Sequence, residues 1–461
     1  MVEGRTHKPV IQSSRCQACN VCIRGCPAEL IPEYREEEGS LRGALYSGKI
    51  SGTSPKENVS LPPCQEACPI RQDTRGYVSL IARGKLKEAL ELIREVNPLP
   101  AVCGFICHHL CEEACLREEV DQSVPMRLLK RFVAEYERTN NREVWRPEIK
   151  KEKRVLVVGS GPAGLAAAND LSLLGYGVTI FEALPVLGGM LAVGIPGFRL
   201  PRDILKMEID GIQELGVEMK TNHRFLFDGN GRSFQKLGFQ AAFVSIGAHR
   251  SSKLNVPGEK LEGVLPGVEF LENVNLGRAI NIGKRVAVIG GGNVALDCAR
   301  SAIRLGAETV EIYYRRSKDE MPAIPEEVEE ATREGIGLHL LVSPVKMMGK
   351  GERATGIEFV RMKLTEPDGT GRPRPIPMEG SQFKVKVDTV ISAIGQKVDQ
   401  RVLKGFDTHK DGTIRVDPET GATSMDGVFA GGDAVTGPGW AIDAIAAGKK
   451  GAVSIDQYLS L

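Results

Sequence analysis

The sequence predicts an α/β protein with two Rossmann-like dinucleotide-binding units behind a helical, cysteine-rich segment. Two observations predict the units: an apolar run that ends in a glycine-rich turn occurs at residues 154–164 and again at residues 285–295. A third observation is the distribution of cysteine, since ten of the eleven lie before residue 116 and the other is Cys298. This segregation indicates two chemically different parts of the chain.

The composition excludes several classes of protein. At 461 residues the chain is long enough for about two to four domains, each with its own core. A formal net charge of +1 gives neither the basic excess of a nucleic-acid-binding protein nor an acidic tail. No run of about 18 apolar residues occurs, and residues 1–15 lack the apolar core of a signal peptide. We therefore expect a cytoplasmic protein with no nucleic acid and no membrane span.

Residues 1–60 carry a run of closely spaced cysteines with the pattern C-x-x-C-x-x-C-x-x-x-C-P. Ferredoxin-like loops hold a four-iron cluster with this spacing, and the last cysteine of such a run commonly ligates a different cluster. Zinc sites prefer paired C-x-x-C knuckles, and disulfides would need an oxidising compartment, so both are the less favoured alternatives. The predicted iron–sulfur ligands in this arm are Cys16, Cys19, Cys22 and Cys26.

Residues 61–150 contain a second group of cysteines. Apolar side chains from Tyr77 to Val96 recur at helical spacing, and a second helix is expected at residues 126–136. Thiols that repeat every four residues could be inert on one buried helix face, but Gly104 and two histidines interrupt this repeat. We expect a helical iron–sulfur domain with candidate ligands Cys64, Cys68, Cys107, Cys111 and Cys115.

The first dinucleotide unit begins with the strand expected at residues 154–158. Gly159 allows the tight turn, Gly161 lets the backbone approach a pyrophosphate, and Gly164 lets the helix pack close to the strand. Glu182 ends the next strand about 20 residues later, where a carboxylate can bind an adenosine ribose. A glycine turn can also serve packing alone, but here the strand, the helix and the acid are all present.

The second unit repeats this pattern from residue 285. Gly290 and Gly292 form the turn, and Ala295 takes the place of the third glycine, which the fingerprint allows. No acid ends the following strand. Arg315 and Arg316 follow instead, and two guanidinium groups favour a 2′-phosphate, which inclines the prediction to NADPH over NADH. The alternative is a solvated arginine pair with acidic neighbours at residues 319 and 320.

The C-terminal segment predicts a return to the first unit. Residues 427–434 read as a buried strand that ends in Asp433, and a helix is expected at residues 440–450. Asp433 is placed to bind a ribityl hydroxyl, and the helix N-terminus would face the negative charge of a reduced flavin. The alternative role of Asp433 is a helix cap.

The residues predicted to contact cofactors lie in these turns and strand ends. In the first unit and its return they are Gly159, Gly161, Pro162, Ala163, Gly164, Glu182, Ala183, Gly189, Arg199, Gly247, Gly432, Asp433 and Ala441. In the second unit they are Gly290, Gly292, Asn293, Val294, Arg315 and Arg316. No catalytic acid or base is predicted, because hydride transfer needs none.

From about residue 61 to its end, the chain resembles the glutamate synthase small (β) subunit family. Related modules occur in dihydropyrimidine dehydrogenase and in NADH-dependent ferredoxin:NADP transhydrogenase. The motifs that carry the resemblance are Cys64-Gln-Glu-Ala-Cys68-Pro, Val102-Cys-Gly-Phe-Ile-Cys, Gly290-Gly-Gly-Asn-Val-Ala, Tyr314-Arg-Arg and Phe429-Ala-Gly-Gly-Asp.

The resemblance implies a helical iron–sulfur domain ahead of a disulfide-reductase-like two-domain flavoprotein. It implies FAD, NADP(H) or NAD(H), and two [4Fe-4S] clusters that relay single electrons. One cluster would be held by Cys68, Cys107, Cys111 and Cys115. The family's other cluster uses cysteines a few residues before the position of Cys64, and this chain has none there. The ferredoxin-like run either substitutes for them or binds a separate cluster, and the expected ligands are Cys16, Cys19 and Cys22 with Cys26 or Cys64.

The implied domain boundaries are 1–60 for the cysteine arm and linker, 61–150 for the helical iron–sulfur domain, 151–252 and 396–461 for the FAD domain, and 253–395 for the NAD(P)H domain. The predicted function is an NAD(P)H oxidoreductase subunit that exchanges electrons with a partner subunit carrying further clusters or a substrate-converting site, as in glutamate synthase or an aldehyde oxidoreductase complex. Alternatives are a bifurcating transhydrogenase-type subunit, a stand-alone reductase of a small molecule and a non-catalytic assembly subunit. A disulfide reductase is disfavoured because Cys298 has no neighbouring thiol in the sequence.

Overall fold

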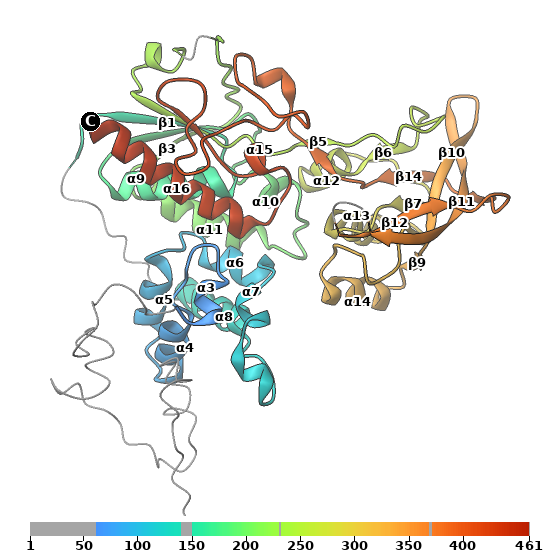
Figure 1. Ribbon diagram of the computed structural model, residues 1–461, viewed down its shortest axis with the longest axis horizontal. Coiled ribbons are helices and arrows are strands. Elements are labelled where there is room, and N and C mark those ends of the chain that lie inside the picture. The colour runs from blue at the N-terminus through green and yellow to red at the C-terminus, as the bar shows by residue number, and fades with distance from the viewer. Residues whose placement is uncertain (1–60, 140–149, 230–231, 368–370, 461) are drawn as a thin grey trace, which may run out of the picture.

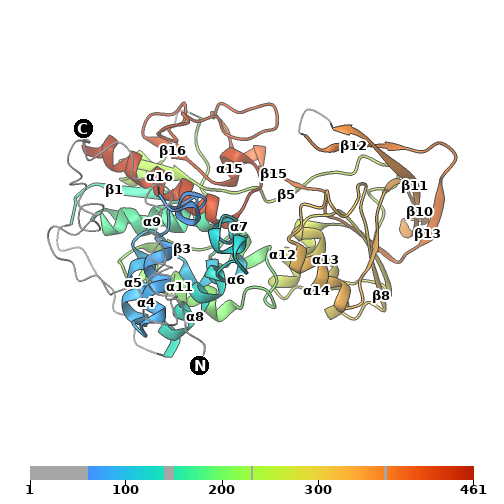
Figure 2. The same ribbon diagram turned by 60° about the horizontal axis from the view of Figure 1, so that its bottom comes forward.

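The computed structural model describes residues 61–139, 150–229, 232–367 and 371–460. It shows a helical part and two α/β units, which we call the first and the second unit (Figure 1). In both views the helical part lies against the first unit, and the second unit lies to one side of it (Figure 2). The predicted cluster ligands at positions 16, 19, 22 and 26 lie outside the described residues.

The helical part is built from short amphipathic helices. The apolar pattern from Tyr77 to Val96 forms two helices instead of one, because Gly84 between them adopts a left-handed φ of 72°. The elements are α3 (Pro63–Glu66), α4 (Thr74–Ala82), α5 (Leu86–Arg94), α6 (Pro100–Ile106), α7 (Leu110–Glu113), η1 (Leu116–Glu119) and α8 (Met126–Thr139).

The first unit contains a five-stranded parallel sheet with the order β16-β4-β1-β2-β3. Alternate side chains of β1 serve two cores: Val155 and Val157 face the helices, whereas Leu156 and Val158 face a cluster rich in phenylalanine. The strands are β1 (Arg154–Val158), β2 (Gly177–Phe181), β3 (Glu218–Lys220), β4 (Ala241–Val244) and β16 (Val428–Ala430). The helices are α9 (Pro162–Leu173), α10 (Met190–Val193), α11 (Arg202–Gln213), η2 (Gln235–Leu237), η3 (Gln400–Val402), α15 (Asp433–Thr436) and α16 (Ala441–Ser460).

The second unit has its own parallel sheet, with the order β6-β14-β7-β8-β9. Its strands are β6 (Val264–Pro266), β7 (Arg285–Ile289), β8 (Thr309–Tyr313), β9 (Gly337–His339) and β14 (Thr389–Ser392). Its helices are α12 (Gly267–Asn275), α13 (Asn293–Arg304) and α14 (Pro325–Arg333). An antiparallel sheet extends it, formed by β10 (Val342–Lys350), β11 (Arg353–Pro367), β12 (Pro373–Pro377) and β13 (Phe383–Lys386).

Two antiparallel segments carry the chain between the units. β5 (Arg250–Ser251) leads out of the first unit, and β15 (Gln396–Lys397) leads back into it. The first unit is therefore completed by strand β16 after the chain has passed through the second unit. The predicted architecture, two Rossmann-like α/β units behind a helical part, is confirmed.

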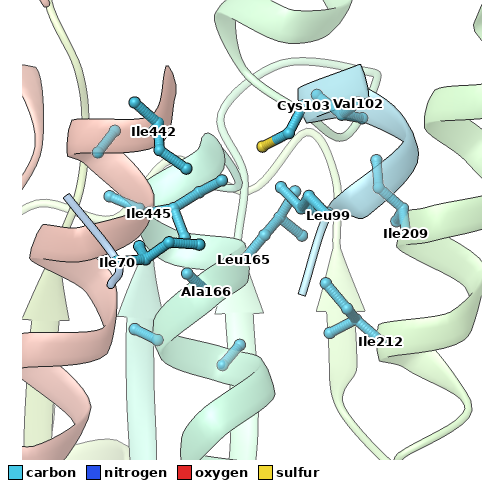
Figure 3. Packing of buried hydrophobic residues seen from close by; sticks show 14 of the residues in the cluster. Ile70, Leu99, Val102, Cys103, Leu165, Ala166, Ile209, Ile212, Ile442 and Ile445 are labelled. Atoms are coloured by element: carbon cyan, nitrogen blue, oxygen red, sulfur yellow. The ribbon is translucent and has the colours of Figure 1, made fainter. Parts of the chain in front are cut away.

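The helical part and the first unit share one hydrophobic core. Leu99 and Cys103 of the α6 region lie beside Ile209 and Ile212 of α11, while Ile442 of α16 lies across the same core (Figure 3). A buried carboxylate strengthens this contact: Glu208 accepts hydrogen bonds of 3.0 and 2.9 Å from the amides of residues 101 and 102. An acid at the start of α6 satisfies amides that the helix leaves free.

No helix within the described segments is long and apolar enough to span a membrane.

Candidate functional site

One cavity of about 1010 Å³ brings the two glycine turns together. It is lined by the turn after β1, the turn after β7, the loop before α16 and the crossing segments near residues 250 and 395. All residues predicted to contact cofactors line it except Gly164. Residues from both units and from the helical part thus surround the same space.

The turn of the first unit is built for close backbone approach. Gly159 has a φ of 102°, and a Cβ there would lie 2.5 Å from the carbonyl oxygen of Ser245. Gly161 is the N-cap of α9 and provides no side-chain cap, so the amides of the first helical turn stay available. A Cβ on Gly164 would lie 2.0 Å from the carbonyl oxygen of Gly159, so this glycine serves the packing of α9.

Glu182 is buried at the end of β2 and faces the cavity. Its Oε2 accepts hydrogen bonds from the amide of Ser160 at 2.9 Å and from its hydroxyl at 2.6 Å. Its Oε1 accepts the amide of Leu184 at 2.8 Å. These bonds fix the carboxylate beside the glycine turn, and Oε1 retains one lone pair for a further hydrogen bond.

In the second unit, positive side chains follow β8. Arg315 is exposed at the cavity and forms no ion pair with a described residue. Arg316 is buried, and its Nε donates to the carbonyl oxygen of Pro373 at 2.9 Å. Glu320, weighed above as a local partner, instead accepts a hydrogen bond of 3.1 Å from the amide of Ser317, and bonding to Ser317 lowers the pKa of Glu320. Arg315 is therefore available to an anion.

A third arginine reaches this place from a distant segment. Arg372, next to β12, lines the cavity and donates to the hydroxyl of Tyr314 at 3.0 Å. It lies 56 residues beyond Arg316 in the sequence, so the strand pattern gave no signal for it. Only the pairing of β11 with β12 brings it to the nucleotide side of the unit.

Arg199 of the first unit forms ion pairs with the second unit beside the cavity. It lines the cavity, but its guanidinium is buried between two carboxylates of the second unit, Asp297 at 2.8 Å and Glu327 at 2.9 Å. Burial raises the pKa of Asp297 to about 6, although Arg199 acts in the opposite direction. The loop of the first unit is thereby tied to α13 and α14 of the second.

Asp433 lies at the C-terminal end of β16, as predicted, and starts the short helix α15. Its Oδ1 accepts the amide of Gly439 at 3.2 Å, which holds the loop before α16, and it caps no residue of α16 itself. Burial raises its pKa to about 6. The following helix begins at Ala441 as expected but runs to Ser460, ten residues beyond the predicted end at 450.

The helical part reaches the cavity through a contact that the sequence did not reveal. His108 stacks on Trp440 with ring centroids 4.3 Å apart and an interplanar angle of 14°. Trp440 and Ile106 both line the cavity. His249 is half-buried, and desolvation lowers its pKa; it also lines the cavity and was not predicted. For His108, the only available signal was its position directly after Cys107.

All seven cysteines in the described residues are free thiols. Cys298 is buried in α13, 3.6 Å from the carbonyl oxygen of Gly267, so it is a packing residue. The other six belong to the helical part and lie in or against its core. Within the described segments, no group of three or more His, Cys, Asp or Glu side chains could hold a single metal ion.

Neighbouring thiols of the helical part raise one another's pKa values. Burial, with smaller contributions from the thiols of Cys107 and Cys68, raises the pKa of Cys111 to about 12. Burial also raises the pKa of Cys64, and its nearest thiol influence is Cys115. Soft sulfur donors gathered in a buried helical site fit a sulfur-ligated iron–sulfur cluster.

Comparison with known protein families matches both parts of the chain. The pyridine nucleotide-disulphide oxidoreductase model matches residues 153–448. The model described as dihydropyrimidine dehydrogenase domain II, 4Fe-4S cluster, matches residues 58–142.

Curated relatives align along most of the chain. The NADP(+)-dependent formate dehydrogenase subunit beta of Moorella thermoacetica is 46% identical over 91% of this chain and 62% of its own length. The NADPH-Fe(3+) oxidoreductase subunit beta of Geobacter sulfurreducens is 41% identical over 86% of this chain and 63% of its own. The glutamate synthase [NADPH] small chain of Halomonas elongata is 33% identical over 87% of this chain and 88% of its own length. The chain thus spans about three-fifths of the first two relatives.

Among solved structures, FprA of Mycobacterium tuberculosis in complex with NADPH has a similar fold. Its TM-score is 0.57 at 19% identity, and the match covers 67% of this chain and 85% of that one. At this identity the likeness concerns the fold of the two units.

Proposed function

We propose a function for a chain that belongs to the pyridine nucleotide-disulphide oxidoreductase family and to the relatives of the glutamate synthase small chain, with a 4Fe-4S domain ahead of the two units. The family binds FAD and NADP, and the chain is an oxidoreductase of this type. We infer that it is an electron-transfer subunit, which takes electrons from NADPH through FAD and iron–sulfur clusters to a partner subunit. The reverse direction uses the same residues.

The observation that carries this proposal is the shared cavity. A hydride passes only between groups in contact, and the two glycine turns, one for each nucleotide, open into the same space. When bound, FAD supplies the exchange between hydride transfer and single-electron transfer. The protein supplies position, since Gly161 and the α9 amides would hold the FAD pyrophosphate while Glu182 and Asp433 would hold its hydroxyl groups.

The second unit would bind NADPH through the same kinds of group, a glycine turn and the N-terminus of a helix. The turn at Gly290 and the start of α13 at Asn293 would accept its pyrophosphate. Arg315, with Arg316 and Arg372 beside it, would accept the 2′-phosphate that distinguishes NADPH from NADH. We propose NADPH as the coenzyme because these three cations line one end of the cavity.

The helical part would hold the clusters. We propose Cys68, Cys107, Cys111 and Cys115 for one cluster, and Cys16, Cys19 and Cys22 with Cys26 or Cys64 for the other. The stack of His108 on Trp440 supports an electron exit from the cavity toward the turn that contains Cys107. The domain boundaries stated above remain part of this proposal.

We propose a partner subunit that holds further clusters or a substrate-converting site. Support comes from relatives that are named as subunits of larger enzymes. A cytoplasmic location is likewise proposed, since clustered free thiols persist in a reducing compartment.

Anaerobic stopped-flow mixing tests the coenzyme and the enzyme class together. The FAD-loaded protein should lose its flavin absorbance with NADPH, and at much higher concentration with NADH. No loss of absorbance with either coenzyme would contradict the proposal and favour a non-catalytic assembly subunit. Steady turnover of a small metabolite without any protein partner would instead favour the stand-alone reductase.

A further inference from the structure

A lysine is buried in the centre of the helical part without a carboxylate partner. Lys130 of α8 is 6% exposed, and its Nζ lies 6.0 Å from the ring centroid of Tyr77. Within the described residues, no carboxylate forms an ion pair with it. Buried ammonium groups are normally paired, because a lone charge in a protein interior is costly. An anionic partner is therefore expected in the functional protein.

Lys130 belongs to α8, which packs against the helices α6 and α7 that carry Cys103 and Cys111. Burial alone would lower the pKa of Lys130, but the thiols of Cys103, Cys107, Cys68 and Cys111 together raise it above its usual value. The geometry of α8 keeps the lysine there: α8 packs against α6 and α7, and the Arg127 guanidinium donates to the carbonyl oxygen of Cys107 at 3.3 Å.

The nearby carboxylates are engaged elsewhere. Glu112 of α7 accepts the main-chain amide of Arg127 at 2.6 Å. Glu208 of α11 accepts two amides at the start of α6 and lies 3.7 Å from Arg94. The groups left to face Lys130 are the cysteine side chains, which carry negative charge when they ligate iron.

We propose that Lys130 is the counter-charge of the iron–sulfur cluster held by Cys68, Cys107 and Cys111 with a fourth ligand, and that it raises the reduction potential of this cluster. The inference rests on the proposed function. A cluster that accepts one electron from reduced FAD gains one negative charge, and a fixed positive charge in a buried site favours that reduced state. Lys130 acts as a positioning residue and ligates no iron.

The neighbouring residue on the same helix provides a matched control. Arg131 also carries one positive charge, but its guanidinium lies over the ring of Phe105 at 3.8 Å and its Nε donates to Glu135 at 3.0 Å. Its charge is thus compensated by a carboxylate. Arg131→Gln removes the same formal charge from α8 without removing a charge that faces the thiols.

Potentiometric titration followed by electron paramagnetic resonance tests the proposal on the full chain, loaded with FAD and with iron and sulfide. Lys130→Met should shift the midpoint potential of one cluster to a more negative value at unchanged iron content. Lys130→Arg and Arg131→Gln should leave that potential close to the wild-type value. If Lys130→Met loses the cluster and Lys130→Arg retains it, the requirement for positive charge is supported in another way.

Two results would overturn the proposal. The first is Lys130→Met with full iron content and an unchanged potential. The second is Lys130→Arg with the same shift, or the same cluster loss, as Lys130→Met. Dithionite supplies the electrons in this titration, so a failure of NADPH to reduce the flavin would contradict the proposed function and leave the result on Lys130 intact.

Discussion

The two nucleotide-binding units share a strand, a glycine turn and a helix, but they differ where the second strand ends. In the first unit, the buried Glu182 is fixed by the amide and hydroxyl of Ser160. In the second unit, the chain continues into Arg315 and Arg316, which face the same cavity. A carboxylate suits free ribose hydroxyls, whereas guanidinium groups suit a phosphate. In the proposed function, the turn would recognise what the two nucleotides share, and the strand end would distinguish them.

The two glycines inside the first turn allow the largest test of this comparison. Gly164→Ala should destabilise the first unit by about 3 kcal/mol, because its Cβ would overlap the carbonyl oxygen of Gly159. A Cβ on Gly161 meets nothing within 4 Å, so Gly161→Ala should unfold like the wild type while binding FAD more weakly. Urea unfolding and FAD content separate the two effects. Equal stability of both variants would show that Gly164 does not serve packing.

Removal of an arginine that follows β8 in the second unit should change the preference between NADPH and NADH. Arg315→Ala should weaken the binding of NADPH by about 1.5 to 3 kcal/mol, because a charge-assisted hydrogen bond is lost. The KM for NADPH should rise roughly 10- to 100-fold. NADH should be nearly unaffected. Lys318→Ala is the control, since this exposed lysine of the same loop does not line the cavity. An equal loss for both coenzymes would refute recognition of the 2′-phosphate by Arg315.

The ion pair between the units predicts a smaller, pH-dependent effect. Burial raises the folded-state pKa of Asp297 to about 6, above its unfolded value, so the folded protein binds the proton more tightly. The contribution of Asp297 to stability should therefore rise as the pH falls from 7 to 5, by about 1 kcal/mol.

Urea unfolding at pH 7, 6 and 5 gives the free energy of unfolding of the wild type and of Asp297→Asn. The wild-type value minus the variant value should rise toward pH 5. If this difference in free energy of unfolding stays constant or falls toward pH 5, the folded-state pKa of Asp297 is not raised. Asp388 offers a comparison at the more exposed contact with Arg285, at 2.7 Å, where hydrogen bonding to Arg285 lowers the pKa of Asp388. Its Asn variant should show no such trend between pH 7 and pH 5, because a lowered carboxyl pKa lies below this range.

Local features of the fold could be predicted from sequence, and long-range ones could not. β1 and β7 begin at Arg154 and Arg285 as expected, because an apolar run followed by a glycine turn has few alternative conformations. The contacts of Arg372 and Lys130 depend on packing between distant segments, for which periodicity contains no information. The ion pairs of Arg199 with Asp297 and Glu327 also join distant segments.

Rapid mixing with NADPH, followed by freeze-quenching and electron paramagnetic resonance, tests the central claim most directly. If one cavity joins the two nucleotides and the helical part provides the exit, the flavin absorbance should fall first and reduced-cluster signals should follow in the same sample. Clusters that stay oxidised beside a fully reduced flavin would contradict the account.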